Sequence, residues 1–283
     1  VVRPSAKKRV AIVIANPAVS STTGWPVGFW WSELTHPYHA FTEAGYEIEI
    51  FSPGGGACRA DAMSDPNDAS GYSKTDLISQ GFIHTPELKA LVDNTKKVAD
   101  IDVAAFDAIV VAGGQAPMFS FEQASELHQK FAAFHGAGKV AAALCHGVAI
   151  LAYAKDSQGN YIAQGKTVTG FANVEEDFAD NAVWSYGLLP QGTHVMPWRI
   201  EDRLKANRGE TIDHFRPLNE RFFEKAGLIE VASDDLYQKH PHAILETFLL
   251  YQATPGVKGF SARTLRALYN VRSIMNGRFR ADP

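Results

Sequence analysis

Six short runs of apolar, mostly β-branched residues recur along the chain, and longer amphipathic segments separate them. The runs are RVAIVIA (9–15), YEIEIFS (46–52), FDAIVVAGG (106–114), KVAAALC (139–145), KTVTGF (166–171) and GLIEVAS (227–233). Continuous apolar strands are typical of a parallel sheet that is covered on both faces. The alternation predicts an α/β fold of the flavodoxin-like, doubly wound type, with a mainly parallel sheet and helices on both faces.

The segments between these runs show apolar residues at roughly helical spacing. Four of them predict helices, within residues 28–46, 84–101, 121–138 and 146–155. Thr85 followed by Pro86 is typical of a helix start, with a capping residue and then proline at the first helical position.

Two parts of the chain depart from this rhythm. Residues 54–84 are rich in Gly, Asp and Ser, and we expect a polar excursion there rather than a helix. The strand–helix rhythm also stops after about residue 235. The sequence therefore predicts an α/β domain over residues 8–235 and a helical C-terminal extension over residues 236–283.

Composition narrows the class of protein. The 283 residues are 46% hydrophobic and 20% charged with a net charge of −4, so a nucleic-acid or membrane partner is not expected. No apolar run is long enough to span a membrane. The two cysteines, Cys58 and Cys145, form no CxxC pair, which favours a reducing, cytoplasmic location. Cys58 is expected to be an ordinary loop thiol.

The segment ALCHGVAIL (143–151) changes from strand-like to helix-like at Cys145. A nucleophile on such a tight turn needs small neighbours two residues away on each side, and Ala143 and Gly147 satisfy this. A helix N-terminus is expected to lower the pKa of the thiol, and the N–H of His146 could stabilise an oxyanion. The alternative is a buried cysteine that acts as a small hydrophobic residue.

Two further segments carry residues suited to the same site. The strand FDAIVVAGG ends at Gly113 and Gly114, where the backbone can approach a ligand closely, although a plain β-to-α turn is the alternative. Glu33 follows a cluster of aromatic residues, where a carboxyl group can stay protonated or can contact a thiol. An exposed glutamate at a helix start is the alternative.

A third segment offers an acid for the histidine. Glu175 and Glu176 follow a predicted strand end, about thirty residues after Cys145, and one of them could orient the imidazole of His146. A solvated acidic helix start is the alternative. No metal site is expected, because His36 and His39 have no further ligand at a suitable spacing and the acidic stretch DAMSDPNDASG lacks the calcium-loop pattern.

Taken in order, these motifs resemble the ThiJ/PfpI superfamily, which shares the class I glutamine amidotransferase-like fold. The resemblance extends from about residue 8 to about residue 205. It rests on GFWWSELTHPYHAFTEAGYEIEIFSPGGG, AIVVAGGQAPM, AALCHGVAIL and KTVTGFANVEED. The Cys-His pair with a downstream acid is similar to the large branch of the superfamily, which contains glutathione-independent glyoxalases and heat-shock chaperones that are also reported as deglycases.

The resemblance implies roles for individual residues. Cys145 would be the nucleophile, His146 the general base and Glu176 the orienting acid, with Glu175 as the adjacent alternative. Glu33 matches the carboxyl group that contacts the thiol. The amides of Gly114 and His146 match the oxyanion hole, and the expected substrate-binding set is completed by Gly113, Gln115 and Phe171.

The activity that this implies is a cofactor-free glyoxalase or deglycase that converts 2-oxoaldehydes such as methylglyoxal to 2-hydroxy acids, in a homodimer. A stress chaperone with an apolar patch at Trp25, Phe29, Trp30 and Trp31 is one alternative. A cysteine peptidase or amidase, and a redox sensor that oxidises Cys145, are others. A glutamine amidotransferase is disfavoured, because such enzymes usually have glycine at the position of His146.

The sequence departs from the superfamily pattern in three places. Gln115 and Ala116 stand where the glyoxalase relatives usually have His-Gly. Residues 205–235 look inserted or rearranged, and the usual closing segment is not recognisable. The last ~50 residues therefore lie outside the resemblance.

Overall fold

A computed structural model describes residues 7–206 and 214–217 of the chain. The chain divides into two units, Val1–Phe215 and Arg216–Pro283. The predicted strand at 227–233 and the predicted C-terminal extension at 236–283 lie outside the described residues, so both stay predictions.

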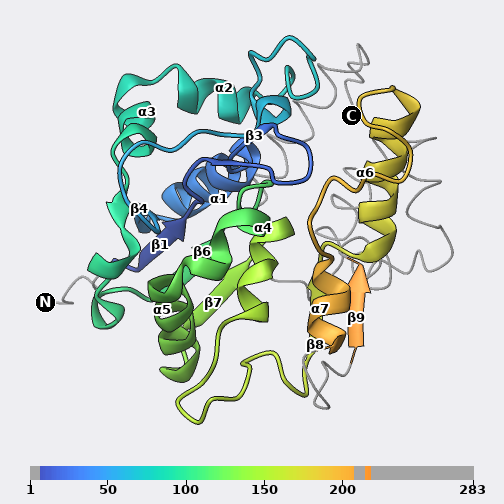
Figure 1. The fold of residues 1–283 in the computed structure, drawn as a ribbon. Coiled ribbons are helices and arrows are strands. Elements are labelled where there is room, and N and C mark those ends of the chain that lie inside the picture. The colour runs from blue at the N-terminus through green and yellow to red at the C-terminus, as the bar shows by residue number, and fades with distance from the viewer. Residues whose placement is uncertain (1–6, 207–213, 218–283) are drawn as a thin grey trace, which may run out of the picture. The chain divides into compact units, whose positions relative to one another are not determined.

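The centre of the first unit is a five-stranded sheet in which each pair of neighbouring strands is parallel (Figure 1). Its order is β5-β4-β1-β6-β7, and the crossovers on both sides of β1 are those of a doubly wound sheet. The predicted fold class is confirmed. The strands are β1 (Arg9–Val13), β4 (Glu47–Ser52), β5 (Lys96–Lys97), β6 (Ala108–Val111) and β7 (Val140–Ala143).

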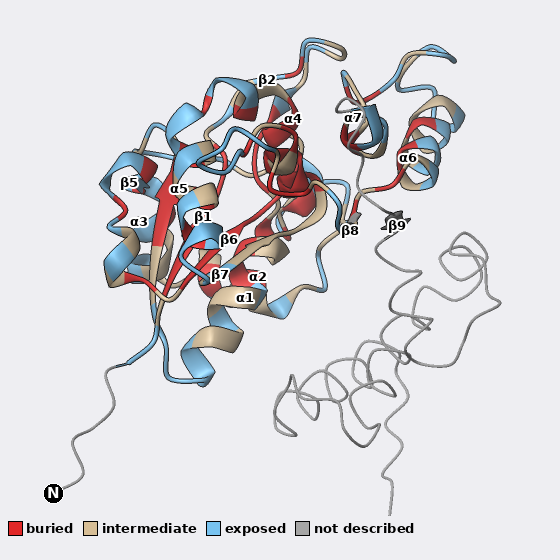
Figure 2. Cartoon of the chain, turned by 90° about the horizontal axis from the view of Figure 1, so that it is seen from below, coloured by how far each residue is buried: buried red, intermediate tan, exposed pale blue. Residues whose placement is uncertain are grey.

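Helices cover both faces of the sheet because successive strand residues point to opposite sides. Ala11, Val13 and Val111 belong to one buried cluster, together with Phe131 and other residues of α5 (Ser125–Gly136). Ile12 belongs to the opposite cluster. That second face is covered by three helices, α1 (Trp31–Glu43), α2 (Leu77–Ile83) and α3 (Pro86–Asp93). Figure 2 shows the resulting buried centre in red.

The remaining elements are short or lie beyond the sheet. A hairpin joins β2 (Ala18–Val19) to β3 (Pro26–Val27). The helices α4 (Pro117–Ser120), α6 (Asn173–Ser185) and α7 (Ile200–Ala206) and the strands β8 (Thr167–Gly170) and β9 (His214–Pro217) follow. The 3₁₀ turns are η1 (Ala62–Ser64), η2 (Val98–Asp100), η3 (Val103–Ala105), η4 (Phe121–Gln123) and η5 (Cys145–Ala152).

Three sequence expectations need correction. Residues 54–84 are not wholly irregular, because α2 begins after Asp76, whose carboxylate accepts the N–H of Ser79, and buries Phe82. The run at 166–171 does form a strand, β8, but that strand is not part of the five-stranded sheet. The segment after Cys145 is a 3₁₀ helix.

Candidate active site

The turn after β7 places Cys145 in a strained backbone conformation. Its φ is 49°, which makes it the one residue other than glycine with a positive φ among residues 7–206 and 214–217. Leu144 before it is still extended, and η5 starts at Cys145 itself. A Cβ atom on Gly147 would lie 2.6 Å from the backbone oxygen of Val111, so this tight turn needs glycine there. Strain of this kind is concentrated at functional sites.

The glycine turn after β6 lies beside Cys145, because β6 and β7 are paired in parallel and end at the same edge of the sheet. Gly114 has a φ of 92°. A Cβ atom on Gly113 would come within 2.8 Å of both the Glu33 carboxylate and the backbone nitrogen of His146. The two turns are therefore in direct contact, and the backbone N–H groups of Gly114 and His146 lie close enough to the thiol of Cys145 to favour its ionised form.

Glu33 reaches the same point from the first turn of α1. Its Oε2 accepts the N–H of Gly113 at 2.6 Å, and its carboxyl group also contacts Cys145 Sγ. Glu33 is thus not an exposed helix-start glutamate. Sheet topology brings residues 33, 113 and 145 to one place although they are far apart in the sequence.

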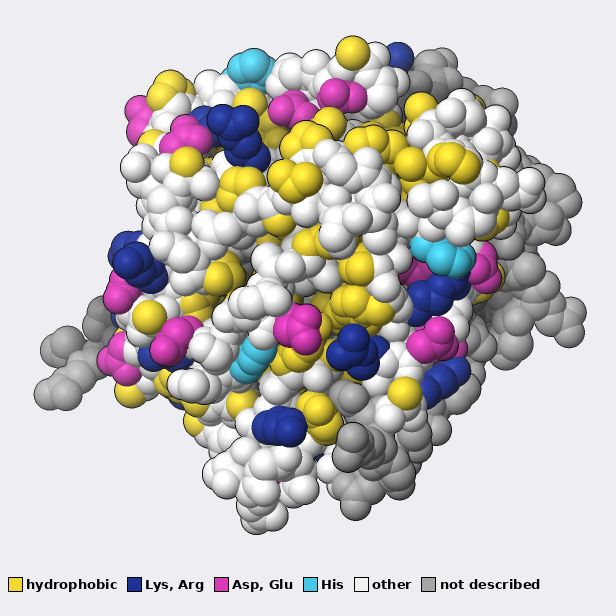
Figure 3. All heavy atoms as spheres, in the orientation of Figure 1, with side chains coloured by type: hydrophobic (Ala, Val, Ile, Leu, Met, Phe, Trp, Pro, Cys, Tyr) yellow, Lys and Arg dark blue, Asp and Glu magenta, His cyan; other side chains and the backbone are white. Residues whose placement is uncertain are grey.

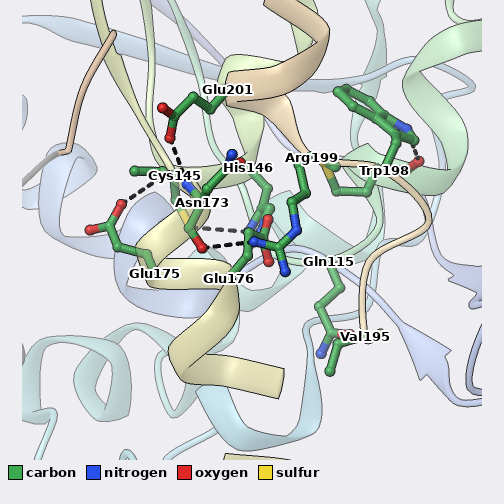
Figure 4. Close-up of polar contacts among 12 residues, drawn as sticks. Gln115, Cys145, His146, Asn173, Glu175, Glu176, Val195, Trp198, Arg199 and Glu201 are labelled. Carbon is green, nitrogen blue, oxygen red and sulfur yellow. Dashed lines mark hydrogen bonds and ion pairs between the residues drawn. The ribbon is translucent and has the colours of Figure 1, made fainter. Parts of the chain in front are cut away.

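A buried chain of polar contacts continues from the thiol (Figure 4). Cys145 Sγ lies 3.4 Å from His146 Nδ1, and His146 Nε2 lies 2.9 Å from Glu176 Oε1. The His146 and Glu176 side chains are only 7% and 3% exposed. Phe171 stacks on the imidazole with a ring-centroid distance of 4.1 Å. Because Nε2 of the imidazole contacts the Glu176 carboxylate, Nδ1 is the nitrogen that faces the thiol.

Glu175 has a different place. Its Oε2 accepts the N–H of Ala172 at 2.7 Å, at the start of α6. Glu175 therefore caps the helix, whereas Glu176, one residue later, is buried against His146. Of the two alternatives that the sequence left open, the structure brings Glu176 to the histidine.

Burial and neighbouring charges shift the pKa values of Cys145, Glu33 and His146. Burial raises the pKa of the Cys145 thiol well above its usual value, and the Glu33 carboxylate raises it further, while the N–H groups of His146 and Gly114 act in the opposite direction. The expectation of a lowered thiol pKa was therefore wrong in direction, because it counted the amides but not burial or Glu33. Burial also raises the pKa of Glu33. For His146, burial lowers the pKa, but the nearby carboxylates, Glu176 first and then Glu33 and Asp61, raise it, and the net shift is upward.

Two features of the site were not found from the sequence. Asp61, 2% exposed, lies behind the glycine turn and accepts two backbone N–H groups. Asp180, on α6, is also buried, and it accepts from His194, Arg199 and the N–H of Val195. Both are aspartates without a local motif, and their partners come together only through the tertiary fold. The buried Oε1 of Gln115, a residue that the sequence did single out, has no hydrogen-bond partner among the described residues.

The other candidate residues are not at the site. His36 pairs with Asp76 and His39 with Glu43, and no cluster of metal-ligating side chains occurs in the described part of the chain. Cys58 is buried beside Asn16 and Thr95 rather than in an open loop.

Of the four aromatic residues before Glu33, Trp25 and Trp30 are half-buried, so only part of the expected apolar patch is exposed. Phe29 and Trp31 are buried, and their rings pack edge to face. On the face drawn in Figure 3, basic and acidic side chains are interspersed. Among the described helices, none is long and apolar enough to cross a membrane.

Comparison with protein families gives two matches. Residues 27–187 match the model of the DJ-1/PfpI family, and residues 222–283 match the model of the uridylyltransferase GlnD third domain. The second segment lies outside the described residues.

Solved structures resemble the first part of the chain. Rapid Encystment Protein 24 kDa of Francisella tularensis is 30% identical, with a TM-score of 0.59 over 70% of this chain and 80% of that chain. Glyoxalase III from Candida albicans has a TM-score of 0.54 and 22% identity over 74% of this chain and 82% of that chain, a likeness of fold alone.

Curated relatives match through the GlnD-type segment. The bifunctional uridylyltransferase/uridylyl-removing enzyme of Burkholderia mallei (strain SAVP1) is 65% identical over 121 residues, which are 42% of this chain and 14% of that protein. The corresponding enzyme of Cupriavidus metallidurans is 62% identical over 100 residues, which are 35% of this chain and 11% of that protein. The chain thus spans a small part of the length of these relatives.

Proposed function

The chain belongs to the DJ-1/PfpI family, and on that basis we propose that its first unit is a cofactor-free enzyme of the glyoxalase type that uses Cys145 as nucleophile. The substrates would be small 2-oxoaldehydes such as methylglyoxal, or related glycated carbonyl adducts. The observation that carries the proposal is the chain of contacts from the half-buried Cys145 to the buried His146 and Glu176, next to two backbone N–H groups and the carboxyl group of Glu33.

The first step is addition of the thiol to the aldehyde. His146 Nδ1, 3.4 Å from Sγ, accepts the thiol proton as the carbon–sulfur bond forms. The π electrons of the carbonyl move onto its oxygen, which then takes up a proton to give a hemithioacetal. The N–H groups of Gly114 and His146 are placed to stabilise negative charge next to the sulfur. A neutral thiol with an adjacent base fits this step, since the thiolate forms only as it attacks.

The second step moves a hydrogen between neighbouring carbons. A base removes the proton from the former aldehyde carbon, and the electron pair forms an enediol with the adjacent carbon. Protonation of that second carbon gives the thioester of a 2-hydroxy acid, so one substrate carbon is oxidised while its neighbour is reduced. Water then hydrolyses the thioester, releases lactate from methylglyoxal and restores the thiol. No external electron carrier is needed.

His146 and Glu33 are the residues available for this proton transfer. The imidazole is held by Glu176 and by the ring of Phe171, so its orientation is fixed before substrate binds. Glu33, whose pKa is raised by burial, is the second group beside the sulfur that can accept and return a proton. General acid–base assistance of this kind contributes ~10²–10⁴ in rate.

The test is methylglyoxal consumption without glutathione, with lactate measured as product. Wild type is compared with Cys145→Ser, and Cys58→Ser is the matched control because Cys58 is buried elsewhere in the same unit. We expect turnover in wild type and in the control and none in Cys145→Ser. Equal turnover in all three proteins would reject the thiol mechanism.

The same nucleophile and base are those of cysteine peptidases and amidases, so amide substrates belong in the same assay. Hydrolysis of an amide without consumption of methylglyoxal would replace the glyoxalase proposal by that alternative. The homodimer and the cytoplasmic location inferred from the sequence remain predictions, and sedimentation and cell fractionation would test them.

A further inference from the structure

Asp61 occupies a position between two segments that form the site. It is 2% exposed and precedes η1. Its Oδ1 accepts the N–H of Gly28 at 2.8 Å, and its Oδ2 accepts the N–H of Gln115 at 2.6 Å. A single carboxylate therefore joins the segment that enters α1 to the turn that follows β6.

These two segments also contact each other directly. The N–H of Ala116 donates to the oxygen of Gly28 at 2.9 Å, and the N–H of Trp30 donates to the oxygen of Gly113 at 3.3 Å. A Cβ atom on Gly114 would lie 2.5 Å from the carbonyl carbon of Phe29. The glycine turn is thus pressed against residues 28–30, and Asp61 bridges the two on one side.

The backbone around Asp61 is fixed to the start of α1. The N–H of Asp61 donates to the oxygen of Phe29 at 2.7 Å. Ser64 Oγ donates to the oxygen of Asp61 at 2.7 Å and accepts the N–H of Trp31 at 3.1 Å. Because α1 carries Glu33, the same small cluster sets the position of the glycine turn and of the carboxyl group that contacts the thiol.

We propose that Asp61 is a positioning residue that, only when ionised, holds the Gly114 N–H against Cys145 Sγ through the amides of Gly28 and Gln115. The inference rests on the role given above to the Gly114 amide. A carboxylate accepts at both oxygens, whereas a carboxylic acid has one oxygen that bears hydrogen. Protonation would turn that hydrogen toward an N–H donor and break one of the two contacts. The glycine turn at Gly113 and Gly114 would then no longer be joined to residues 28–30 through Asp61.

The electrostatic surroundings place this switch near neutral pH. Burial raises the pKa of Asp61 to about 6, against the two amide hydrogen bonds that favour the charged form. The titratable groups that face Asp61 among the described residues are His146, whose positive charge lowers the pKa of Asp61, and Glu33, whose own pKa is raised by the charge of Asp61. As pH falls through about 6, the ionised form and its hold on the turn are lost.

The first measurement uses the wild-type protein and no substrate. Amide resonances of Gly28 and Gln115 are followed by NMR between pH 4.5 and 7.5. We expect both to move together with one midpoint near pH 6, because both amides bind the same carboxylate. Separate midpoints, or no movement over this range, would overturn the proposal.

The second measurement compares Asp61→Asn with wild type. Asparagine has the same size but only one side-chain oxygen, so one amide loses its partner. We expect the rate of Cys145 alkylation by iodoacetamide at pH 7.5, and kcat, to fall between about tenfold and about a hundredfold, with KM nearly unchanged. In wild type, a plot of the logarithm of the alkylation rate against pH should become steeper below about pH 6. In Asp61→Asn the slope should not change there.

The matched control is Asp68→Asn, which removes an exposed-side carboxylate of the same excursion that accepts the amide of a nearby residue, Ser70. It should behave as wild type. If Asp61→Asn retained the steepening, or lost activity only through a raised KM, the proposal would be wrong. Absence of methylglyoxal turnover in wild type would reject the glyoxalase activity but not this inference, because the NMR and alkylation measurements need no substrate. If Asp61→Asn does not fold, the wild-type NMR titration alone decides.

Discussion

Glu176 Oε1 lies 2.9 Å from His146 Nε2, whereas Glu175, the preceding residue, contacts the helix start instead. Two adjacent carboxylates on α6 thus have separate tasks. In a helix, neighbouring side chains point about 100° apart, so only one of them can face the imidazole.

Glu176→Gln should therefore reduce kcat by ~10²–10⁴, because a neutral amide no longer stabilises the imidazolium or fixes its tautomer. Glu175→Gln is the matched control, since glutamine keeps an oxygen for the N–H of Ala172. Steady-state kinetics of the two variants makes the comparison. Equal losses in both would show that the helix start, and not the contact with His146, is what matters.

The pH profile gives an independent check on the same contact. Glu176 raises the pKa of His146, and the base must be neutral to accept the thiol proton, so activity should rise with pH through that raised pKa. In Glu176→Gln the residual activity should rise at a lower pH. If the activity of Glu176→Gln rose over the same pH range as that of wild type, a group other than His146 would be responsible for the rise.

Glu33 and Cys145 form a coupled pair in which each negative charge opposes the other. Glu33→Gln removes the carboxylate that raises the thiol pKa and keeps an acceptor for the N–H of Gly113. We expect the midpoint of Cys145 alkylation against pH to move downward. Glu43→Gln, at the far end of the same helix, should leave it in place. An unchanged midpoint in Glu33→Gln would show that Glu33 already carries the proton when the thiol ionises.

Close packing of the two turns predicts that Gly113 tolerates no side chain. In Gly113→Ala the new Cβ would meet Glu33 Oε2, His146 N and Gly147 N at 2.8–2.9 Å, so we expect a lower Tm and loss of Cys145 reactivity. Gly81→Ala is the control, because no atom of the described residues lies within 4 Å of the added Cβ in α2, and alanine favours a helix over glycine by about 0.5–1 kcal/mol. Thermal unfolding and alkylation rates test both. A Gly113→Ala protein as stable and reactive as wild type would contradict the close contact.

Local patterns were enough to predict the parts of the site that depend on a turn. The sharp turn at Cys145 requires small residues two positions away, and Gly147 is one of them. Gly113 and Gly114 allow a similar close approach where the chain turns after the buried strand β6. Since parallel strands end at one edge of a sheet, the fold class alone brought these two turns together.

The sequence did not reveal what depends on tertiary contact. Asp61 lies in a polar stretch with many similar aspartates, and only the approach of Gly28 and Gln115 distinguishes it. The direction of the thiol pKa shift was missed for a similar reason, because burial and the charge of Glu33 are invisible in the local pattern around Cys145. The helix α2 was missed because Gly81 and its polar neighbours conceal a short buried face.

Detection of the covalent intermediate tests the thiol mechanism most directly. Wild type turning over methylglyoxal is quenched in acid at short times and digested, and the peptide that contains Cys145 is weighed by mass spectrometry. We expect an adduct of one methylglyoxal on Cys145 that forms and decays at the rate of turnover, and none on Cys58. Lactate production without any adduct on Cys145, or with the same rate in Cys145→Ser, would contradict the mechanism.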